Sequence, residues 1–273
     1  MILQNSVLAF PNIFHDDSNR LSLENEAPVE AMHAERLPFT VRLVKNEHDL
    51  CKAVQIRHAA YARHVPGFAA TLSTPESPDT ECGVVVLLAE SKVDGSPLGT
   101  MRIHTNRFRP LSIEQSIELP EALRMRPLAE ATRLGITDER VGRLVKTVLF
   151  KAFYLYCCRN SIEVMVVAGR APIDRQYERL MFEEVYPEMG FIPLAHGGNL
   201  PHKIMSFEVG TAEARWRETN HPLFQFVFRT QHDDIDVGAK MDTSTPKGMI
   251  GRIFPNTSKA LVTVSAKSAV ASL

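Results

Sequence analysis

An acid and a base stand three residues apart in a stretch that otherwise has the composition of a buried strand. The stretch runs from Pro127 to Ile136, and the pair is Glu130 and Arg133. Burying charged groups in a sheet costs several kcal/mol unless they are paired or hydrogen-bonded, so a partner or a catalytic task must compensate for them. Because side chains alternate along a strand, the two would face opposite sides of a regular sheet. Only a β-bulge between them would direct both to one site, and bulges are frequent beside active sites.

Two further arginines lie where the pattern predicts burial. A helix is predicted after Asn46, which can cap it, and Arg57 falls on the same apolar stripe of that helix as Tyr61. Arg102 lies in a predicted strand, on the face that also carries His104. An arginine that faces the core needs an acidic or phosphate partner. The alternative for Arg57 is a side chain at the edge of the stripe that keeps its charge in water.

The start of a second predicted helix offers a seat for a phosphorylated ligand. Arg140-Val141-Gly142-Arg143 combines backbone amides, a glycine and two cations at a helix N-terminus that Asp138 can cap. Such an end attracts the negative charge of a pyrophosphate or a phosphopantetheine group. The motif has one glycine and no repeated glycine pattern, so two ordinary surface arginines are the alternative.

The composition argues against several classes of function. The 273 residues carry 31 Lys and Arg against 32 Asp and Glu, a net charge of -1, so no general field attracts nucleic acid or an anionic membrane. No apolar run has the length of a membrane span. The four cysteines lack CxxC and zinc spacings and no HExxH motif occurs, so no metal site is predicted and the thiols are expected to be reduced in a cytoplasmic protein. Basic residues cluster locally. This cluster could bind a phosphate or an acidic carrier protein, or it could simply be a solvated face. Its members are Arg102, Arg107, Arg109, Arg124 and Arg126.

The remaining pattern places these residues on alternating strands and helices. Strands are predicted at 39–45, 83–89, 98–105, 127–136, 162–168, 191–194 and 203–209. Long helices are predicted from 46 to 65 and from 138 to the paired Cys157 and Cys158, with further helical segments at 174–185, 212–219 and 222–229. The proline-containing loop from Val65 to Glu81 has the length of a functional lid. Residues 1–38 are predicted to be an N-terminal arm, 39–230 the catalytic domain and 231–273 a mobile C-terminal tail.

The order of these elements, together with the Tyr-x-x-Met-Gly-Phe turn at 186–191, resembles the GNAT acyltransferase fold. Within that superfamily the chain is most similar, over about residues 40 to 210, to LuxI-type acyl-homoserine-lactone synthases and FeeM-type N-acyl amino acid synthases. The residues that carry the resemblance are Arg57, Tyr61, Arg102 and Glu130-Ala-Thr-Arg133, which is similar to the family's Glu-x-Ser-Arg pattern. The resemblance implies an α/β (α+β) protein with a central mixed, twisted sheet flanked by helices.

Two departures separate the chain from the lactone synthases. Those enzymes carry two acids just before the first hairpin strand, whereas Asp79 and Glu81 stand here at a different spacing. Their tryptophan after the first helix has no counterpart, since the only tryptophan is Trp216. Both departures favour the amino acid synthase branch.

The resemblance implies transfer of a long-chain acyl group from an acyl carrier protein or acyl-CoA thioester to the amine of an amino acid or a similar small amine. It implies no permanently bound cofactor, and acyl carrier protein and a small amine as partners. The alternatives are a lactone-type synthase, a coenzyme-A-dependent GNAT of other specificity, and a non-catalytic domain that binds acyl groups or acyl carrier protein.

Glu130 and Tyr186 are the expected catalytic residues. Glu130 would receive the amine proton, directly or through a water; its alternative role is to neutralise the arginines, which would lower its pKa and make it a poor base. Tyr186 would protonate the departing thiolate, or its ring packs against the core. Arg57, Tyr61, Arg102 and Arg133 are expected to bind the acceptor, and Arg140, Gly142 and Arg143 the donor. A bulge at Ala131 to Arg133 would expose an amide to the thioester carbonyl, and Val164, Val166 and Phe153 are candidates for an acyl tunnel.

Overall fold

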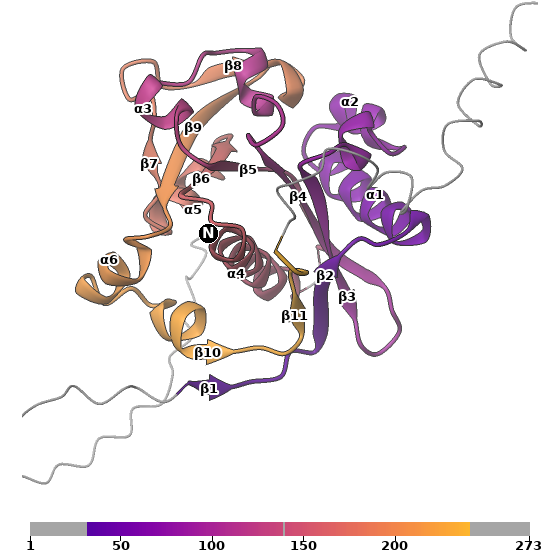
Figure 1. The fold of residues 1–273 in the computed structure, drawn as a ribbon. Helices are drawn as coiled ribbons and strands as arrows, with labels where there is room; N and C mark the ends of the chain where they lie inside the picture. The colour runs from indigo at the N-terminus through magenta and orange to yellow at the C-terminus, as the bar shows by residue number, and fades with distance from the viewer. Residues whose placement is uncertain (1–31, 139, 241–273) are drawn as a thin grey trace, which may run out of the picture. The chain divides into compact units, whose positions relative to one another are not determined.

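One mixed sheet of nine strands organises the residues that the computed structural model describes, 32–138 and 140–240 (Figure 1). The strand order is β11-β2-β3-β4-β5-β6-β9-β7, and β8 also pairs with β9. The first strands are β2 (Phe39–Leu43), β3 (Val84–Ser91), β4 (Pro97–Thr105) and β5 (Leu128–Ile136). They are followed by β6 (Val164–Gly169), β7 (Glu183–Glu184), β8 (Ile192–Leu194), β9 (Leu200–Glu208) and β11 (Ile235–Asp236). The pairs β11–β2 and β5–β6 are parallel and the others antiparallel, which confirms the predicted mixed α/β class.

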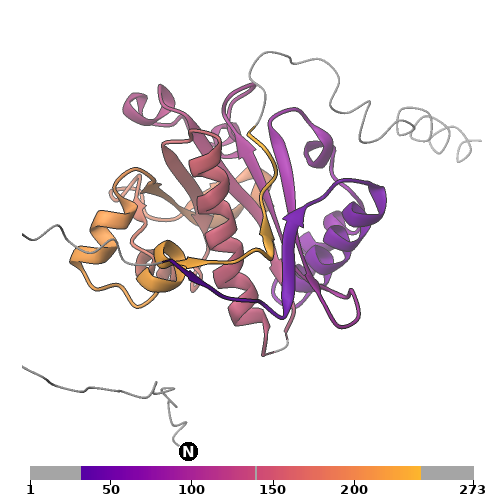
Figure 2. The same ribbon diagram turned by 60° about the horizontal axis from the view of Figure 1, so that its bottom comes forward.

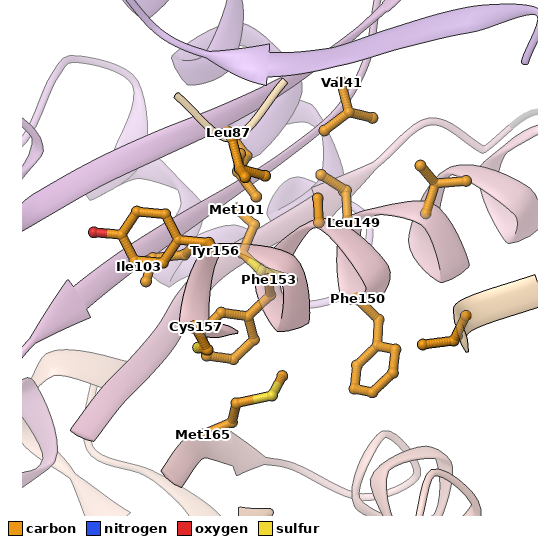
Figure 3. Packing of buried hydrophobic residues seen from close by; sticks show 14 of the residues in the cluster. Val41, Leu87, Met101, Ile103, Leu149, Phe150, Phe153, Tyr156, Cys157 and Met165 are labelled. Atoms are coloured by element: carbon orange, nitrogen blue, oxygen red, sulfur yellow. The ribbon is translucent and has the colours of Figure 1, made fainter. Parts of the chain in front are cut away.

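The two long helices cover opposite faces of this sheet (Figures 1 and 2). Helix α1 (Glu47–Ala62) packs Leu50 and Val54 against the β3 residues Val86 and Leu88. Helix α4 (Gly142–Arg159) packs on the other face, where Leu149, Phe153 and Tyr156 meet Leu87, Met101 and Ile103, as Figure 3 shows. The alternation of side chains along the strands therefore divides the core into two layers, one under each helix.

Helix α1 begins as the sequence predicts. The Asn46 side chain accepts a hydrogen bond of 2.9 Å from the Asp49 backbone N–H, which confirms Asn46 as the cap. The helix lies very close to β5, because a Cβ added at Gly135 would be 3.0 Å from Arg57 Cα and 3.2 Å from Ala60 Cβ. Gly135 thus allows the close approach that brings Arg57 over the sheet.

Helix α4 begins later than predicted. Its first residue is Gly142, and no side chain caps it, so the prediction of Asp138 as the cap is wrong. The chain doubles back first: a Cβ at Gly142 would be 2.4 Å from the carbonyl oxygen of Thr137, a distance that only glycine permits. The helix buries Val145, Val148, Leu149, Ala152 and Tyr156 on one face, whereas Leu144 is 38% exposed.

The connections contain short helical segments. The 65–81 loop folds into α2 (Pro66–Ala69), η1 (Ala70–Leu72) and η2 (Ser77–Thr80). The 106–126 excursion contains η3 (Ser112–Gln115) and α3 (Glu121–Arg124), and η4 (Ala195–Gly197) precedes β9. Helix α5 (Asp174–Arg179) is shorter than predicted because Glu183 and Glu184 pair with β9 as β7. The later segments are α6 (Ala212–Glu218) and the π-helix η5 (Gln225–Arg229).

The segment after Gln231 does not follow the prediction of a mobile tail. Strand β10 (Thr230–Gln231) pairs with β1 (His33–Ala34), and β11 extends the main sheet beside β2. The Asp234 carboxylate also accepts a hydrogen bond of 2.8 Å from Leu37 N–H. The prediction is therefore wrong for residues 231–240, whereas residues 1–31 of the predicted arm and 241–273 of the predicted tail lie outside the described residues.

Candidate active site

A β-bulge in β5 creates the central feature of the site. Glu130 pairs with His104 and Thr132 with Arg102, but the next pair is Gly135 with Thr100, so Arg133 and Leu134 together oppose Met101. Arg133 has a φ of 56°, a left-handed conformation that is uncommon for arginine. A bulge was predicted at Ala131 to Arg133, and the structure has it one position later, at Arg133 and Leu134. It turns the Arg133 side chain towards the α1 face.

Strands β5 and β6 separate immediately before this bulge. Their parallel pairing runs from Leu128 and Val164 to Ala131 and Val167; beyond it, β5 continues beside β4 and β6 continues beside β9. One edge of the β5 backbone beyond Ala131 therefore faces an opening in the sheet.

Two cavities adjoin at this separation. The first, of about 380 Å³, is lined from the α4 side by apolar residues that include Met101, Phe150 and Phe153. The second, of about 480 Å³, lies on the α1 side and is lined by residues that include Tyr61, Phe68 and His196. Both are lined by Ala131, Leu134, Lys146, Ile173, Gln176 and Tyr177. The pair of cavities thus spans the sheet at the point where β5 and β6 part.

Three arginines from three elements converge on the α1 side of the opening. Arg57 of α1 binds Asp79 through both terminal nitrogens at 2.9 and 2.8 Å. Arg102 of β4 lies 3.1 Å from Glu76 and 3.2 Å from Asp79. Arg133 donates from Nε and Nη2 to the two oxygens of Glu76, each at 2.7 Å. The three guanidiniums that the sequence singled out are thus held by two acids of the 65–81 loop.

The ion pairs of the arginines exclude one of the two roles predicted for Glu130, that of neutralising these arginines. Glu130 does not neutralise them: Glu76 and Asp79 do, because the loop folds back over β4 and β5. The edge-of-stripe alternative for Arg57 is wrong as well, since the side chain is fully buried and paired. Burial favours the neutral acids, but the guanidiniums outweigh it and hold the pKa of Glu76 and of Asp79 below their ordinary values.

Glu130 itself lies in a different environment from the one expected. Its side chain is completely buried, and Oε2 accepts a hydrogen bond of 2.6 Å from Ser112 N–H. Burial raises the pKa of Glu130 to about 7; the Ser112 hydrogen bonds and the charge of Arg102 oppose this only in part. The prediction of a lowered pKa for Glu130 is therefore wrong. The carboxyl group is buried, and the arginines form their ion pairs with Glu76 and Asp79 instead.

A histidine stands between Glu130 and the second cavity. His196 Nε2 lies 3.4 Å from Glu130 Oε1, and the ring lines the cavity, whereas Glu130 has no exposed surface. Burial, together with the nearby charge of Arg133, lowers the pKa of His196 to about 4, so the ring is neutral at pH 7.

The other residues expected to bind the acceptor and donor lie around the same opening. Tyr61 lines the second cavity and packs edge-on against Phe68, whose ring lies 5.2 Å from the Arg133 guanidinium. Arg140 and Arg143 are exposed, and Gly142 is buried at the start of α4. Lys146, one turn further along α4, lines both cavities, so the predicted donor seat lies beside the opening.

Tyr186 lies apart from these groups. Its hydroxyl donates a hydrogen bond of 2.6 Å to the carbonyl oxygen of Glu118, and the ring packs with Ile192 and its neighbours. It is not among the residues that line either cavity, whereas Tyr177 lines both. Of the tunnel candidates, Phe153 lines the first cavity, and Val164 and Val166 pack in a separate core cluster.

Sequence reasoning missed Glu76, His196, Ser112 and Tyr177. Glu76 carries a local signal, because Glu76-Ser-Pro-Asp79 forms a capping box around η2. His196 stands in the irregular segment Ala195-His-Gly-Gly, where no periodicity marks a burial site.

The described residues show neither a metal-binding group nor a membrane-spanning helix. In residues 32–138 and 140–240, no three His, Cys, Asp or Glu side chains are grouped for a metal ion. Within the same residues, no helix combines the length and apolarity that crossing a membrane requires.

Comparison with known proteins gives structural likenesses only. No protein-family model matches the chain, and no curated protein matches its sequence. The N-acyl amino acid synthase FeeM, from uncultured soil microbes, is similar in structure with a TM-score of 0.49 and 16% identity, over 69% of this chain and 96% of that one. The coenzyme-A-dependent acyl-homoserine lactone synthase BjaI has a TM-score of 0.49 and 17% identity, over 75% and 96%. An aminoglycoside acetyltransferase in complex with coenzyme A has a TM-score of 0.46 and 16% identity, over 66% and 99%. Both kinds of synthase that the sequence resembles are thus among the similar structures.

Proposed function

We propose that the protein is an N-acyltransferase that moves a long-chain acyl group from an acyl carrier protein or acyl-CoA thioester to the amine of an amino acid or a similar small amine. The observation that carries the proposal is the pair of adjoining cavities where β5 and β6 separate, apolar on the α4 face and charged on the α1 face. A thioester carbonyl held at the opening would have its chain on one side and its acceptor on the other.

The first cavity supports an apolar acyl chain. Its wall consists mainly of side chains such as Phe150, Phe153 and Phe182 that belong to the core under α4. Burial of a methylene group in such surroundings is worth about 0.8 kcal/mol, so a longer chain gains more from this cavity.

The charge balance on the other face supports an acceptor with a carboxylate. Three guanidiniums, those of Arg57, Arg102 and Arg133, face two carboxylates, those of Glu76 and Asp79, which leaves one positive charge in excess. Arg133 lines the cavity, and its planar fork suits bidentate recognition of a carboxylate. An amino acid would supply that carboxylate together with the amine.

The chemistry of amide formation needs a base and an oxyanion site. A pKa of about 7 for Glu130 is well matched to taking a proton from an amine near neutral pH. The β5 edge beyond Ala131 faces the opening instead of β6, so an amide of the bulge is available to the thioester carbonyl oxygen. The Tyr186 hydroxyl is hydrogen-bonded to the Glu118 carbonyl oxygen, so in this mechanism the thiolate leaves without being protonated by Tyr186.

The start of α4 supports binding of the donor's phosphate groups. Arg140 and Arg143 are exposed there, Gly142 keeps the turn tight, and the helix continues directly into the cavity wall at Lys146. Both coenzyme A and the phosphopantetheine arm of an acyl carrier protein carry phosphate that this end of a helix attracts.

The test is to incubate the purified protein with acyl-CoA and acyl carrier protein thioesters of several chain lengths, together with a panel of amino acids and other amines. Mass spectrometry should detect N-acylated products that are absent with the Glu130→Gln variant. If no combination of thioester and amine gives an amide, while acyl chains co-purify with the protein, the domain binds acyl groups without transferring them and the proposal fails.

A further inference from the structure

The wall of the second cavity is strongly biased towards positive charge. Four lysine and arginine side chains from different parts of the sheet and helices line it; they are Arg63, Arg133, Lys146 and Arg170. Three histidines line it as well, whereas no aspartate or glutamate is among the described residues that form the wall. A ligand that fills this cavity therefore meets cations and neutral groups, which favours an anionic ligand.

Arg170 is the cation of this wall that lacks a partner. Within residues 32–138 and 140–240 its guanidinium forms neither a hydrogen bond nor an ion pair, although the residue is half-buried. Arg133, by contrast, is paired with Glu76. Lys146 donates a hydrogen bond to the side-chain oxygen of Gln176, a neutral partner that does not compensate its charge. A partly desolvated guanidinium without an acid favours the binding of an anion from outside the protein.

The turn that carries Arg170 is held firmly at the end of β6. Asp174 N–H donates a hydrogen bond of 3.0 Å to the carbonyl oxygen of Arg170. The preceding Gly169 packs so closely on this turn that an added Cβ would lie 2.9 Å from Asp174 Cα. Ala168, two residues before Arg170, lines the same cavity. The end of β6 therefore fixes where this cation enters the wall.

His202 of β9 lies near both Arg170 and Arg133. Gly169 pairs with Lys203 across β6 and β9, so Arg170 follows β6 at the level of His202. Burial, together with the charges of Arg170 and Arg133, lowers the pKa of His202. All three side chains line the second cavity. A ligand in this cavity is therefore exposed to both guanidinium charges.

We infer that the acceptor carries two anionic groups, an α-carboxylate that Arg133 recognises and a second acidic group that Arg170 binds. The inference rests on the proposed function and narrows its acceptor to amino acids whose side chain ends in a carboxylate or a phosphate. One carboxylate offsets the single positive charge that Glu76 and Asp79 leave over in the arginine cluster. A second acidic group is needed to offset Arg170, whose charge an uncharged side chain would leave unpaired when the ligand displaces water.

The test compares each acidic acceptor with a neutral counterpart of nearly equal size. With one acyl thioester as donor, the kcat/KM of the wild-type protein for glutamate should exceed that for glutamine roughly 10- to 100-fold, the usual worth of a hydrogen bond to a charged group. Aspartate against asparagine, and O-phosphoserine against serine, distinguish side-chain length and carboxylate from phosphate.

Variants of Arg170 assign the preference to this side chain. Arg170→Gln should bring the ratio of the two kcat/KM values close to one, and Arg170→Glu should favour lysine over glutamine because the charge of the site is reversed. The matched control is Arg175→Gln. Arg175 is exposed on α5 and is not among the residues that line either cavity, so this variant should keep the wild-type ratio.

The outcomes separate this inference from the proposed function. Equal kcat/KM values within every acidic and neutral pair, or an unchanged ratio in Arg170→Gln, would overturn the inference while amide formation stands. A raised KM for the thioester in Arg170→Gln, with the acceptor ratio unchanged, would also overturn it and assign Arg170 to the donor. If no amine is acylated, the proposed function fails, and isothermal titration calorimetry then decides on the second acidic group. Glutamate should bind to the wild-type protein at least about 10-fold more tightly than glutamine, and equal affinities would overturn the inference.

Discussion

Arg133 and Glu76 form a bidentate ion pair in which both N···O distances are 2.7 Å. The pair joins the bulge of β5 to the 65–81 loop, and it is possible only because the positive φ of Arg133 turns that side chain out of the regular strand alternation. Glu76 thereby occupies the fork that we propose for the acceptor carboxylate. Binding of an anionic acceptor would then require Glu76 to share or yield Arg133, which couples the loop to the substrate.

Asp79→Ala should strongly destabilise the protein. The Asp79 carboxylate is fully buried and serves both Arg57 and Arg102, so its loss leaves buried guanidiniums short of charge. Breaking a buried ion pair in this way costs about 3–5 kcal/mol, which urea denaturation would measure as a lower free energy of unfolding. The control is Lys45→Ala, which removes an exposed pair with Asp236 and should change stability by less than about 1 kcal/mol. Similar losses in both variants would contradict the buried network.

Glu130→Gln should stabilise the folded protein above neutral pH. The pKa of Glu130 rises from 4.5 to about 7 on folding, so the folded state holds the proton more tightly. The stabilising contribution is fully present below pH 4.5 and is lost as the pH rises through 7. The variant should therefore match wild type near pH 4.5 and exceed it at pH 8 by on the order of 3 kcal/mol. Urea unfolding at several pH values checks this, and a constant difference between the two proteins would refute it.

Gly135→Ala should disturb the site as well as the packing. The added Cβ would lie 3.0 Å from the Arg57 backbone, so α1 must move away from β5. Overpacking of this kind costs about 1–3 kcal/mol, and the displaced Arg57 should also reduce turnover. Gly67→Ala is the matched control, because a Cβ there meets no atom within 4 Å and the change should be neutral or slightly stabilising. Thermal unfolding and activity of both variants test the close approach.

Ala131→Phe should shorten the acyl chain that the protein accepts. Ala131 lines both cavities at the separation of β5 and β6, so a phenyl ring there would narrow the way into the apolar cavity. The kcat/KM for long-chain thioesters should fall by about 100-fold or more, whereas that for an acetyl thioester should fall much less. Acetyl transfer by the same variant serves as the internal control, and an equal loss for all chain lengths would argue against a chain in this cavity.

Replacing both Arg140 and Arg143 with Ala should weaken donor binding. If these exposed cations bind phosphate, the KM for the thioester should rise roughly 10-fold or more with little change in kcat, and the effect should shrink at high salt. Arg217→Ala, on the α6 surface and paired with Glu213, is the control and should leave KM unaltered. An unchanged KM in the double variant would show that the phosphate groups of the donor bind elsewhere.

The residue pattern alone was enough to predict the series of strands and long helices and to identify the buried charges. Periodicity marks the elements because each must bury one face, and Arg57, Arg102, Glu130 and Arg133 stood out because they interrupt apolar patterns. Capping chemistry likewise identified Asn46 as the start of α1.

The pairing of those charges depends on long-range contacts that the residue pattern does not reveal. Glu76 and His196 lie on irregular segments whose positions depend on long-range packing, and neither shows a periodic signal. The sequence pattern offered Glu130, the one acid recognisable as buried, as one possible partner of the arginines, whereas the folded 65–81 loop supplies Glu76 and Asp79 at hydrogen-bond distance. Ion pairing depends on distances of a few ångströms between residues far apart in the chain, and these distances are set by how loops close over a sheet.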